Sequence, residues 1–395
     1  HRMAAGNPSV NLDLFMMSEA HVRDLYAGYT EKADVAVTEG MMGLFDGYDG
    51  MKGSCAEIAC MLKIPVVLIV NAKSTAYSVA PLLYGFKQFN KQVQIGAVFN
   101  FVASENHYSF LKQACEDAGV EALGYLPKCA DVEIPSRHLG LSLDEDFYFE
   151  EFADRVAELV EKHVNINRLL ELTKPVATAV VPISAGRHIY KREPSFPIAV
   201  ACDPAFNFVY EANIRYLHHL GEVTYFSPLA DTSLPDVGFV YLPGGYPELY
   251  LAALSANRQM LQSIRRYVES GGKLLAECGG MMYLCDEIRD KNGDVYPMAG
   301  VLHQSATMEN MKLRLGYRTL LYNETRLKGH EFHYSRLVEQ QNPLPSCAVA
   351  YTAKGVETDT PLYHYKNVWA GYTHLYWADP VGNEWFTKFV IDGNI

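Results

Sequence analysis

A cysteine that stands between an apolar stretch and two glycines is the residue of this chain best suited to do chemistry. Residues 273–277 have the pattern of a short strand, Cys278 follows, and residues 279–284 suit a helix. A thiol at a helix N-terminus faces backbone N–H groups, which favour the thiolate. The layout is typical of a nucleophile elbow in which sulfur attacks a carbonyl carbon. The alternative is that Cys278 is a small buried apolar residue, as free cysteines usually are.

Glycine turns near such a nucleophile could stabilise a developing oxyanion. Gly279 directly follows the cysteine, and its missing Cβ lets a substrate approach the backbone N–H. Gly244 and Gly245 follow the strand-like run 238–241, so either could supply a second N–H donor. The alternative is that this Gly-Gly pair only makes a tight turn.

A histidine close to the C-terminus is the candidate base. His374 lies in the aromatic run 369–377, where an imidazole would be buried and neutral. A neutral imidazole within reach of the thiol could accept its proton. The alternative is a core histidine whose polar atoms are satisfied by neighbours.

The first half of the chain alternates strand and helix patterns. The expected strands are 33–38, 65–72, 93–102 and 120–126, and the expected helices are 54–63, 74–90 and 104–118. Apolar strands separated by helices indicate a parallel sheet that is covered on both faces. Ligands of such sheets bind at the carboxyl ends of the strands.

Three polar residues follow these expected strands. Glu39 comes directly after the first strand and is followed by a glycine-rich loop that also holds Asp46, so the two carboxylates could hold Mg²⁺ beside phosphates. The alternative is that Glu39 caps a turn and Asp46 begins another. Asn100 lies near the end of a later strand, where asparagine is a common turn former.

Seven segments of the second half, in order, resemble one family. They are 202–208 (CDPAFNF), 226–231 (FSPLAD), 244–249 (GGYPEL), 254–258 (LSANR), 276–284 (AECGGMMYL), 329–335 (GHEFHYS) and the run around His374. The chain is similar here to the cobyrinate a,c-diamide synthase family, corrin-amidating ligases that contain a class I glutamine amidotransferase domain.

The resemblance implies two α/β domains. Residues 1–173 would form a dethiobiotin synthetase-like, parallel-sheet nucleotide-binding domain, residues 174–195 a proline-containing linker, and residues 196–395 the amidotransferase domain. The family begins with a phosphate loop, whereas G-x-x-x-x-G-K-[ST] occurs nowhere in this chain. We therefore expect that about fifty native residues precede His1 and that the chain as given has a weakened ATP site.

The resemblance also implies an activity and a role for each candidate residue. Glutamine and ATP would be used to amidate the a and c acetate carboxylates of cobyrinate in cobalamin biosynthesis, with Mg²⁺ as metal. Cys278 and His374 would hydrolyse glutamine, aided by the turns of Gly244, Gly245 and Gly279. In the other half Glu39 would bind the metal, Asp46 would face metal or substrate, and Asn100 would read the adenine edge through its amide. Arg137 and His138 could meet substrate carboxylates or simply pack, and homodimer formation is left open.

One position departs from the wider class. Many class I amidotransferases have a glutamate two residues after the histidine, and here Tyr376 stands there. The orienting acid is therefore missing or comes from elsewhere, which indicates a Cys–His pair.

Other functions remain as alternatives. One is a sibling ligase, namely a cobyric acid synthase or a nickel-sirohydrochlorin a,c-diamide synthase. Another is a non-catalytic binding protein that retains the amidotransferase fold. A zinc-protease interpretation of 329–333 is disfavoured because its histidines lie at i and i+3 instead of i and i+4.

Composition limits the partners and the compartment. The net charge of −12, with no Lys/Arg block, predicts no nucleic-acid or membrane binding. The apolar runs are too short to span a bilayer. Eight cysteines without a C-x-x-C pair favour a reducing, cytoplasmic compartment.

Overall fold

The computed structural model describes residues 1–129, 132, 136–137, 140–141, 148–174, 197–341 and 343–392. The chain divides into two compact units. The first unit comprises described residues of 1–6, 40–45 and 54–183, and the second comprises those of 7–39, 46–53 and 184–395. The predicted linker 174–195 lies outside the described residues, apart from Lys174. Segments 7–39 and 46–53 thus group with the second half of the chain, which the proposed boundaries did not anticipate.

The first unit contains a three-stranded parallel sheet in the order β1-β2-β3. Its strands are β1 (Val66–Asn71), β2 (Ile95–Val102) and β3 (Glu121–Pro127), and its helices are α1 (Arg2–Ala5), α3 (Cys55–Leu62), α4 (Ala80–Phe89), α5 (Glu105–Ala118), α6 (Phe149–His163) and α7 (Ile166–Leu172). Ser54 and Ser104 accept hydrogen bonds from N–H groups of the first turns of α3 and α5, which fixes where these helices begin. Two further short strands, β4 (Ser136–Arg137) and β5 (Gly140–Leu141), pair antiparallel.

The predicted alternation of strands and helices is confirmed from residue 54 to residue 127, but the first expected strand was wrong. Residues 33–40 form no strand. Their apolar side chains gain no burial, since Val37 is 93% exposed. An apolar pattern predicts a strand only where a sheet is present to cover it.

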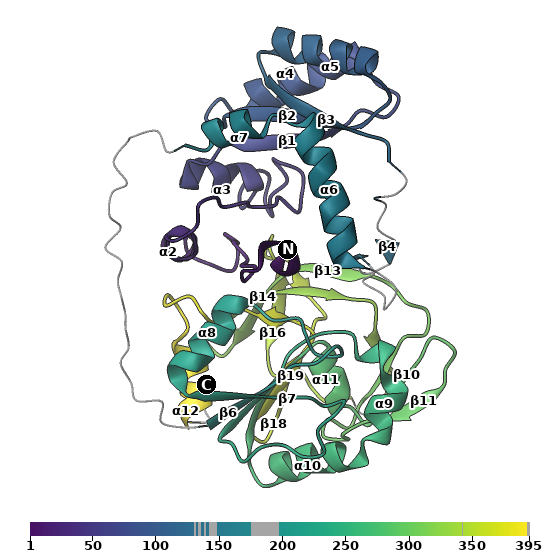
Figure 1. The fold of residues 1–395 in the computed structure, drawn as a ribbon. Coiled ribbons are helices and arrows are strands. Elements are labelled where there is room, and N and C mark those ends of the chain that lie inside the picture. Colours follow the sequence, from purple (N-terminus) through teal and green to yellow (C-terminus); the bar gives the residue numbers. More distant parts are fainter. Residues whose placement is uncertain are drawn as a thin grey trace. The chain divides into compact units, whose positions relative to one another are not determined.

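The second unit is built on a six-stranded sheet in the order β18-β19-β9-β8-β6-β7 (Figure 1). Neighbouring strands are parallel except β18 and β19. The strands are β6 (Pro197–Ala201), β7 (Glu222–Phe226), β8 (Phe239–Leu242), β9 (Lys273–Glu277), β18 (Leu362–Tyr365) and β19 (Val368–Gly371). This arrangement confirms the predicted α/β class.

Helices cover both faces of this sheet. Helices α8 (Glu211–Leu220) and α12 (Glu384–Asp392) share one apolar core with Ile198 and Val200 of β6. Helices α9 (Leu251–Ala256), α10 (Arg258–Glu269) and α11 (Gly279–Leu284) share the other core with Ala199 and Ala201 of the same strand. The alternation along β6 is the period of two expected for a strand buried on both sides.

A five-stranded antiparallel sheet in the order β17-β16-β13-β14-β20 adjoins this core. It comprises β13 (Arg314–Tyr322), β14 (Thr325–His333), β16 (Val349–Thr352), β17 (Glu357–Thr358) and β20 (His374–Leu375). A four-stranded sheet, β11-β10-β12-β15, comprises β10 (Glu287–Arg289), β11 (Val295–Pro297), β12 (Ser305–Thr307) and β15 (Arg336–Leu337).

The segment 7–39, which contains α2 (Glu19–Thr30), packs on the antiparallel sheet. Phe15 stacks on Tyr317 with ring centroids 4.5 Å apart, and Lys328 Nζ donates to the Phe15 carbonyl at 3.0 Å. These contacts belong to the second unit alone. Among the described helices, none has the length and apolar character needed to cross a membrane.

Candidate active site

Cys278 lies at the turn between β9 and α11, in the predicted strand–turn–helix layout. Its φ of 47° and ψ of −106° are unusual for a residue with a side chain. Its N–H donates to Gly371 O at 2.7 Å, and its carbonyl accepts from Met282 N at 2.9 Å. The strained backbone is therefore held from both sides, by β19 and by the helix. The residue is 6% exposed.

The glycines around this turn are required by close packing. A Cβ at Gly280 would lie 2.2 Å from Leu242 O, and one at Gly279 would lie 2.7 Å from Pro247 Cδ. Gly245 has a φ of 158°, and a Cβ there would lie 2.1 Å from Ala205 O. A Cβ at Gly279 would also lie 3.2 Å from Gly245 N, so the two predicted oxyanion loops adjoin each other. Their role as donors remains a prediction.

His374 lies on β20 and faces the other glycine of the turn. A Cβ at Gly244 would approach the imidazole Cε1 to 2.1 Å, so only glycine allows the ring this position. The Phe208 ring lies against it at 4.3 Å between centroids. The residue is 3% exposed. Burial, with added repulsion from His330 and His333, lowers the pKa of His374 to about 3, so the ring is neutral at physiological pH.

Burial also controls the thiol. It raises the pKa of Cys278 well above its ordinary value, and the nearby carboxylate of Glu248 acts in the same direction. The N–H of Gly279 opposes this shift. A thiol in these surroundings stays protonated until a base removes its proton, so the chemistry requires a partner such as His374.

Glu277, which the sequence interpretation missed, supplies a carboxylate beside the imidazole. Its Oε2 lies 3.9 Å from His374 Nδ1. Tyr241 Oη donates to Oε2 at 2.7 Å, and Leu375 N donates to Oε1 at 2.9 Å. Burial raises the pKa of Glu277 to about 8, against these two hydrogen bonds. The available signal was a lone carboxylate in an otherwise apolar strand, directly before the cysteine.

Strand pairing brings the candidate residues together. β19 pairs with β9 and ends at Gly371, whose carbonyl accepts from Cys278, and the chain then reaches His374 within three residues. The Gly244–Gly245 turn follows β8, the other neighbour of β9. The cluster therefore sits at the carboxyl ends of three adjacent strands, where ligands of such sheets bind.

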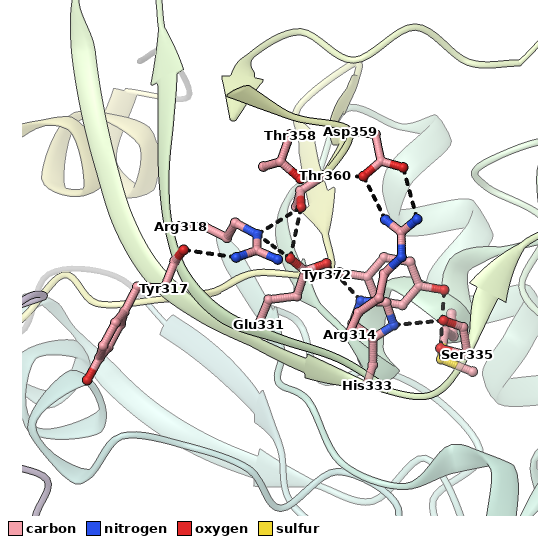
Figure 2. Close-up of polar contacts among 11 residues, drawn as sticks. Arg314, Tyr317, Arg318, Glu331, His333, Ser335, Thr358, Asp359, Thr360 and Tyr372 are labelled. Carbon is pink, nitrogen blue, oxygen red and sulfur yellow. Dashed lines mark hydrogen bonds and ion pairs between the residues drawn. The ribbon is translucent and has the colours of Figure 1, made fainter. Parts of the chain in front are cut away.

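A buried polar network supports this cluster (Figure 2). His333 Nε2 lies 2.8 Å from Glu331 Oε1, and Thr360 Oγ1 donates to Glu331 Oε2 at 2.8 Å. Arg318 Nε also lies 2.5 Å from Glu331 Oε2. These hydrogen bonds engage Glu331 and His333 with protein partners.

The network reaches the loop that leads to the base. His333 stacks on Tyr372 with centroids 3.7 Å apart and an interplanar angle of 6°. Ser335 Oγ donates to Tyr372 Oη and to Met282 Sδ, each at 3.2 Å. Met282 belongs to α11, so the network contacts the nucleophile helix and the His374 loop together.

The residues predicted for the nucleotide half lie elsewhere. Glu39 and Asp46 are exposed and group with the second unit, and Asn100 lies on β2 of the first unit. Asn100 Oδ1 accepts from Phe101 N at 2.9 Å, the bond of a local turn former. Its adenine role and the metal role of the carboxylates remain predictions. His138 lies outside the described residues, and so does the side chain of Arg137.

Comparisons with known proteins agree with this geometry. Residues 197–381 match the family of the CobB/CobQ-like glutamine amidotransferase domain. The cobyrinate a,c-diamide synthase of Caldanaerobacter subterraneus is 38% identical over 95% of this chain and 85% of its own length. The synthase of the same name from Salmonella typhimurium is 34% identical over 96% of this chain and 85% of its own length. The hydrogenobyrinate a,c-diamide synthase of Pseudomonas aeruginosa is 37% identical over 94% of this chain and 83% of its own length.

Among solved structures, a glutamine amidotransferase from Thermotoga maritima matches 46% of this chain and 76% of its own, at 12% identity and a TM-score of 0.32. That likeness is too low to bear on the argument, whereas the sequence relatives extend over nearly the whole chain. The chain belongs to the cobyrinate a,c-diamide synthase family, and its second half carries that family's glutamine amidotransferase domain.

Proposed function

We propose that this protein is an ATP-dependent ligase that uses glutamine to amidate the a and c acetate carboxylates of cobyrinate. The observation that carries the proposal is the placement of Cys278 at a strained strand–helix turn, beside a glycine turn that His374 contacts. The family relationship adds the class of reaction. The relatives' names give cobyrinate or hydrogenobyrinate as the compound that is diamidated.

The glutaminase reaction follows from the residues present. Cys278 Sγ attacks the carboxamide carbon of glutamine while its proton passes to His374. The oxyanion of the tetrahedral intermediate receives hydrogen bonds from Gly279 N–H and from the Gly244–Gly245 turn. His374 returns the proton to the leaving nitrogen, so that ammonia departs and a glutamyl thioester remains. Water then hydrolyses the thioester to glutamate and regenerates the thiol.

The nucleotide half requires oxygen ligands for a metal and a partner for ATP. Glu39 and Asp46 are exposed carboxylates, and Mg²⁺ beside phosphates commonly takes one or two such ligands plus waters. Their donor chemistry therefore fits Mg²⁺. When bound, ATP supplies the phosphoryl group that converts a substrate carboxylate into an acyl phosphate, which ammonia can attack. Cobalt, where present, belongs to the corrinoid substrate.

Labelling of the nucleophile tests the glutaminase half. The intact protein is treated with 6-diazo-5-oxonorleucine, and its mass is measured beside a Cys278→Ser variant. One adduct that is absent from the variant is the expected result. An unlabelled Cys278 that also fails to hydrolyse glutamine would favour the non-catalytic alternative.

Substrate competition tests the ligase half. Cobyrinate, hydrogenobyrinate, nickel-sirohydrochlorin and cobyric acid synthase substrates are offered with ATP, Mg²⁺ and glutamine, and amidated products are counted by mass. Two amidations of cobyrinate or hydrogenobyrinate are expected. Exclusive amidation of another tetrapyrrole would favour a sibling ligase.

A further inference from the structure

We infer that Glu277 is the positioning acid of this glutaminase, which orients the His374 imidazole through Nδ1 and stabilises the imidazolium that forms during attack. The inference rests on the proposed glutaminase function. It replaces the expected Cys–His pair with a triad whose acid directly precedes the nucleophile in sequence, instead of following the histidine.

The first observation concerns the Nδ1 atom of the His374 imidazole. This atom is buried and has no hydrogen-bond partner among the residues that the structure describes. The Glu277 carboxylate lies 3.9 Å away, about 1 Å beyond a hydrogen bond. Catalytic hydrogen bonds are often long without substrate and tighten in the complex. A small rotation of either side chain would therefore satisfy Nδ1.

Two hydrogen bonds hold the Glu277 carboxylate beside the imidazole. Leu375, whose N–H donates to Glu277 Oε1, is the residue after His374, so the acid is bonded to the backbone of the strand that carries the base. Tyr241 Oη holds the second oxygen from β8. Both oxygens thus accept hydrogen bonds, which favours the ionised form against burial, and each still has a lone pair for an N–H donor.

The other groups that could orient His374 already have hydrogen-bond partners. Glu331 also acts electrostatically on His374, but its oxygens bond to His333, Thr360 and Arg318. Tyr376, at the position where many class I enzymes have their glutamate, bonds to His21 through its hydroxyl. The other titratable groups that affect His374 are His330 and His333, whose charges would oppose an imidazolium.

The proton balance requires only one transfer. Cys278 gives its proton to His374 Nε2, while Nδ1–H stays on the ring and donates to Glu277. The carboxylate gains no proton and acts by orientation and charge. Its further effect is to select the tautomer in which Nε2 is unprotonated and able to act as base.

Two substitutions separate charge from shape. Glu277→Gln keeps the size but presents an amide N–H₂ that can donate to Nδ1, which selects the wrong tautomer. Glu277→Asp keeps the charge on a side chain one methylene shorter. We expect Glu277→Gln to lower kcat for glutamine hydrolysis about a hundredfold or more, with KM changed only a few fold. Glu277→Asp should recover at least tenfold of that loss.

A readout that needs no glutamine accompanies the kinetics. The rate of Cys278 alkylation by iodoacetamide is measured from pH 5 to pH 10 by intact mass. In the native protein His374 and the ionised Glu277 should support alkylation from about pH 8, whereas Glu277→Gln should shift the reaction to higher pH, where the buried thiol ionises without a base. Glu287→Gln serves as the control for loss of a half-buried carboxylate, since it breaks the ion pair with Arg289 on β10 and should leave the pH profile unchanged.

The outcomes decide between roles. Loss of kcat with the altered alkylation profile, and rescue by aspartate, would establish Glu277 as the positioning acid. An unchanged profile would overturn the inference, whether kcat is retained within threefold or falls equally in both variants together with the melting temperature. If the native protein does not hydrolyse glutamine, the proposed function fails, while the alkylation profiles still decide the role of Glu277.

Discussion

The hydroxyl of Tyr376 lies 2.7 Å from His21 Nε2, which ties helix α2 to the strand that continues from the candidate base. A second tie lies close by, where Ser18 N donates to Asp379 Oδ2 at 2.6 Å. The ring of Tyr210 packs edge-on against Tyr376. Residues 18–21 thus support the backbone that follows His374.

Removing the hydrogen bond between Tyr376 and His21 should loosen the strand that carries His374. Tyr376→Phe deletes the hydroxyl and leaves the half-buried His21 ring without its partner, which should cost about 1–3 kcal/mol in the free energy of unfolding. Glutamine hydrolysis should fall several fold through kcat. Urea unfolding and steady-state kinetics measure the two effects.

Tyr365→Phe is the matched control for that change. Its hydroxyl donates to Glu269 at 3.1 Å on the exposed surface of the same unit, so its loss should cost less than about 0.5 kcal/mol. Equal destabilisation by both variants would show that the α2 contact does not stabilise this strand specifically.

Gly244→Ala should abolish glutamine hydrolysis with little unfolding. The new Cβ would lie 2.1 Å from His374 Cε1, so the imidazole must leave its position. Gly28→Ala is the comparison, because a Cβ there meets no atom within 4 Å and the residue lies inside α2. It should stabilise the protein by about 0.5–1 kcal/mol and retain activity. Full activity in Gly244→Ala would contradict the placement of the base.

Stability should fall as the pH drops below about 6.5, and His374 should account for part of that loss. The pKa of His374 is lowered from 6.5 to about 3 by burial, so between these values the unfolded chain binds a proton that the folded protein does not. Stability therefore rises with pH across this window. His374→Asn should flatten the slope in melting curves from pH 4 to pH 7.

Glu277 should affect the pH dependence of stability in the opposite direction from His374. Its pKa is raised to about 8 by burial, so between its ordinary value near 4.5 and 8 the folded protein holds the extra proton and stability falls as pH rises. The proposed triad needs the ionised carboxylate, so glutamine hydrolysis should rise as the pH passes through about 8. Glu277→Gln should remove both this rise and the decline in stability, and a decline that remains in the variant would show that another group causes it.

Local patterns predicted the parts of the site that depend on neighbours in sequence. The apolar run before Cys278 and the glycines after it predicted the strand–turn–helix layout, and the glycine pair at 244–245 predicted the facing turn. Glu277 was missed because its partners, Tyr241 and Leu375, approach only after three strands have paired. The packing of segment 7–39 was missed for the same reason, since it depends on contacts that are remote in sequence.

The buried network and the surface pair of the antiparallel sheet should differ sharply in strength. Glu331 is fully buried, and although burial acts to raise its pKa, the hydrogen bond from His333 and the charge of Arg318 hold that pKa below its ordinary value. Figure 2 shows Asp359 paired with Arg314. Arg314 Nη1 lies 2.7 Å from Asp359 Oδ1, and the Asp359 side chain is 72% exposed. Glu331→Gln should therefore cost about 3 kcal/mol or more, because the Arg318 charge stays buried without its counterion, and Asp359→Asn should cost at most about 1 kcal/mol. Chemical denaturation of both variants measures the difference, and similar costs would show that the buried carboxylate does not stabilise the protein more than the surface one.

The same pair of variants should differ in the mobility of the loop before His374. Because His333 stacks on Tyr372, Glu331→Gln should speed amide exchange at residues 372–374, and Asp359→Asn should not.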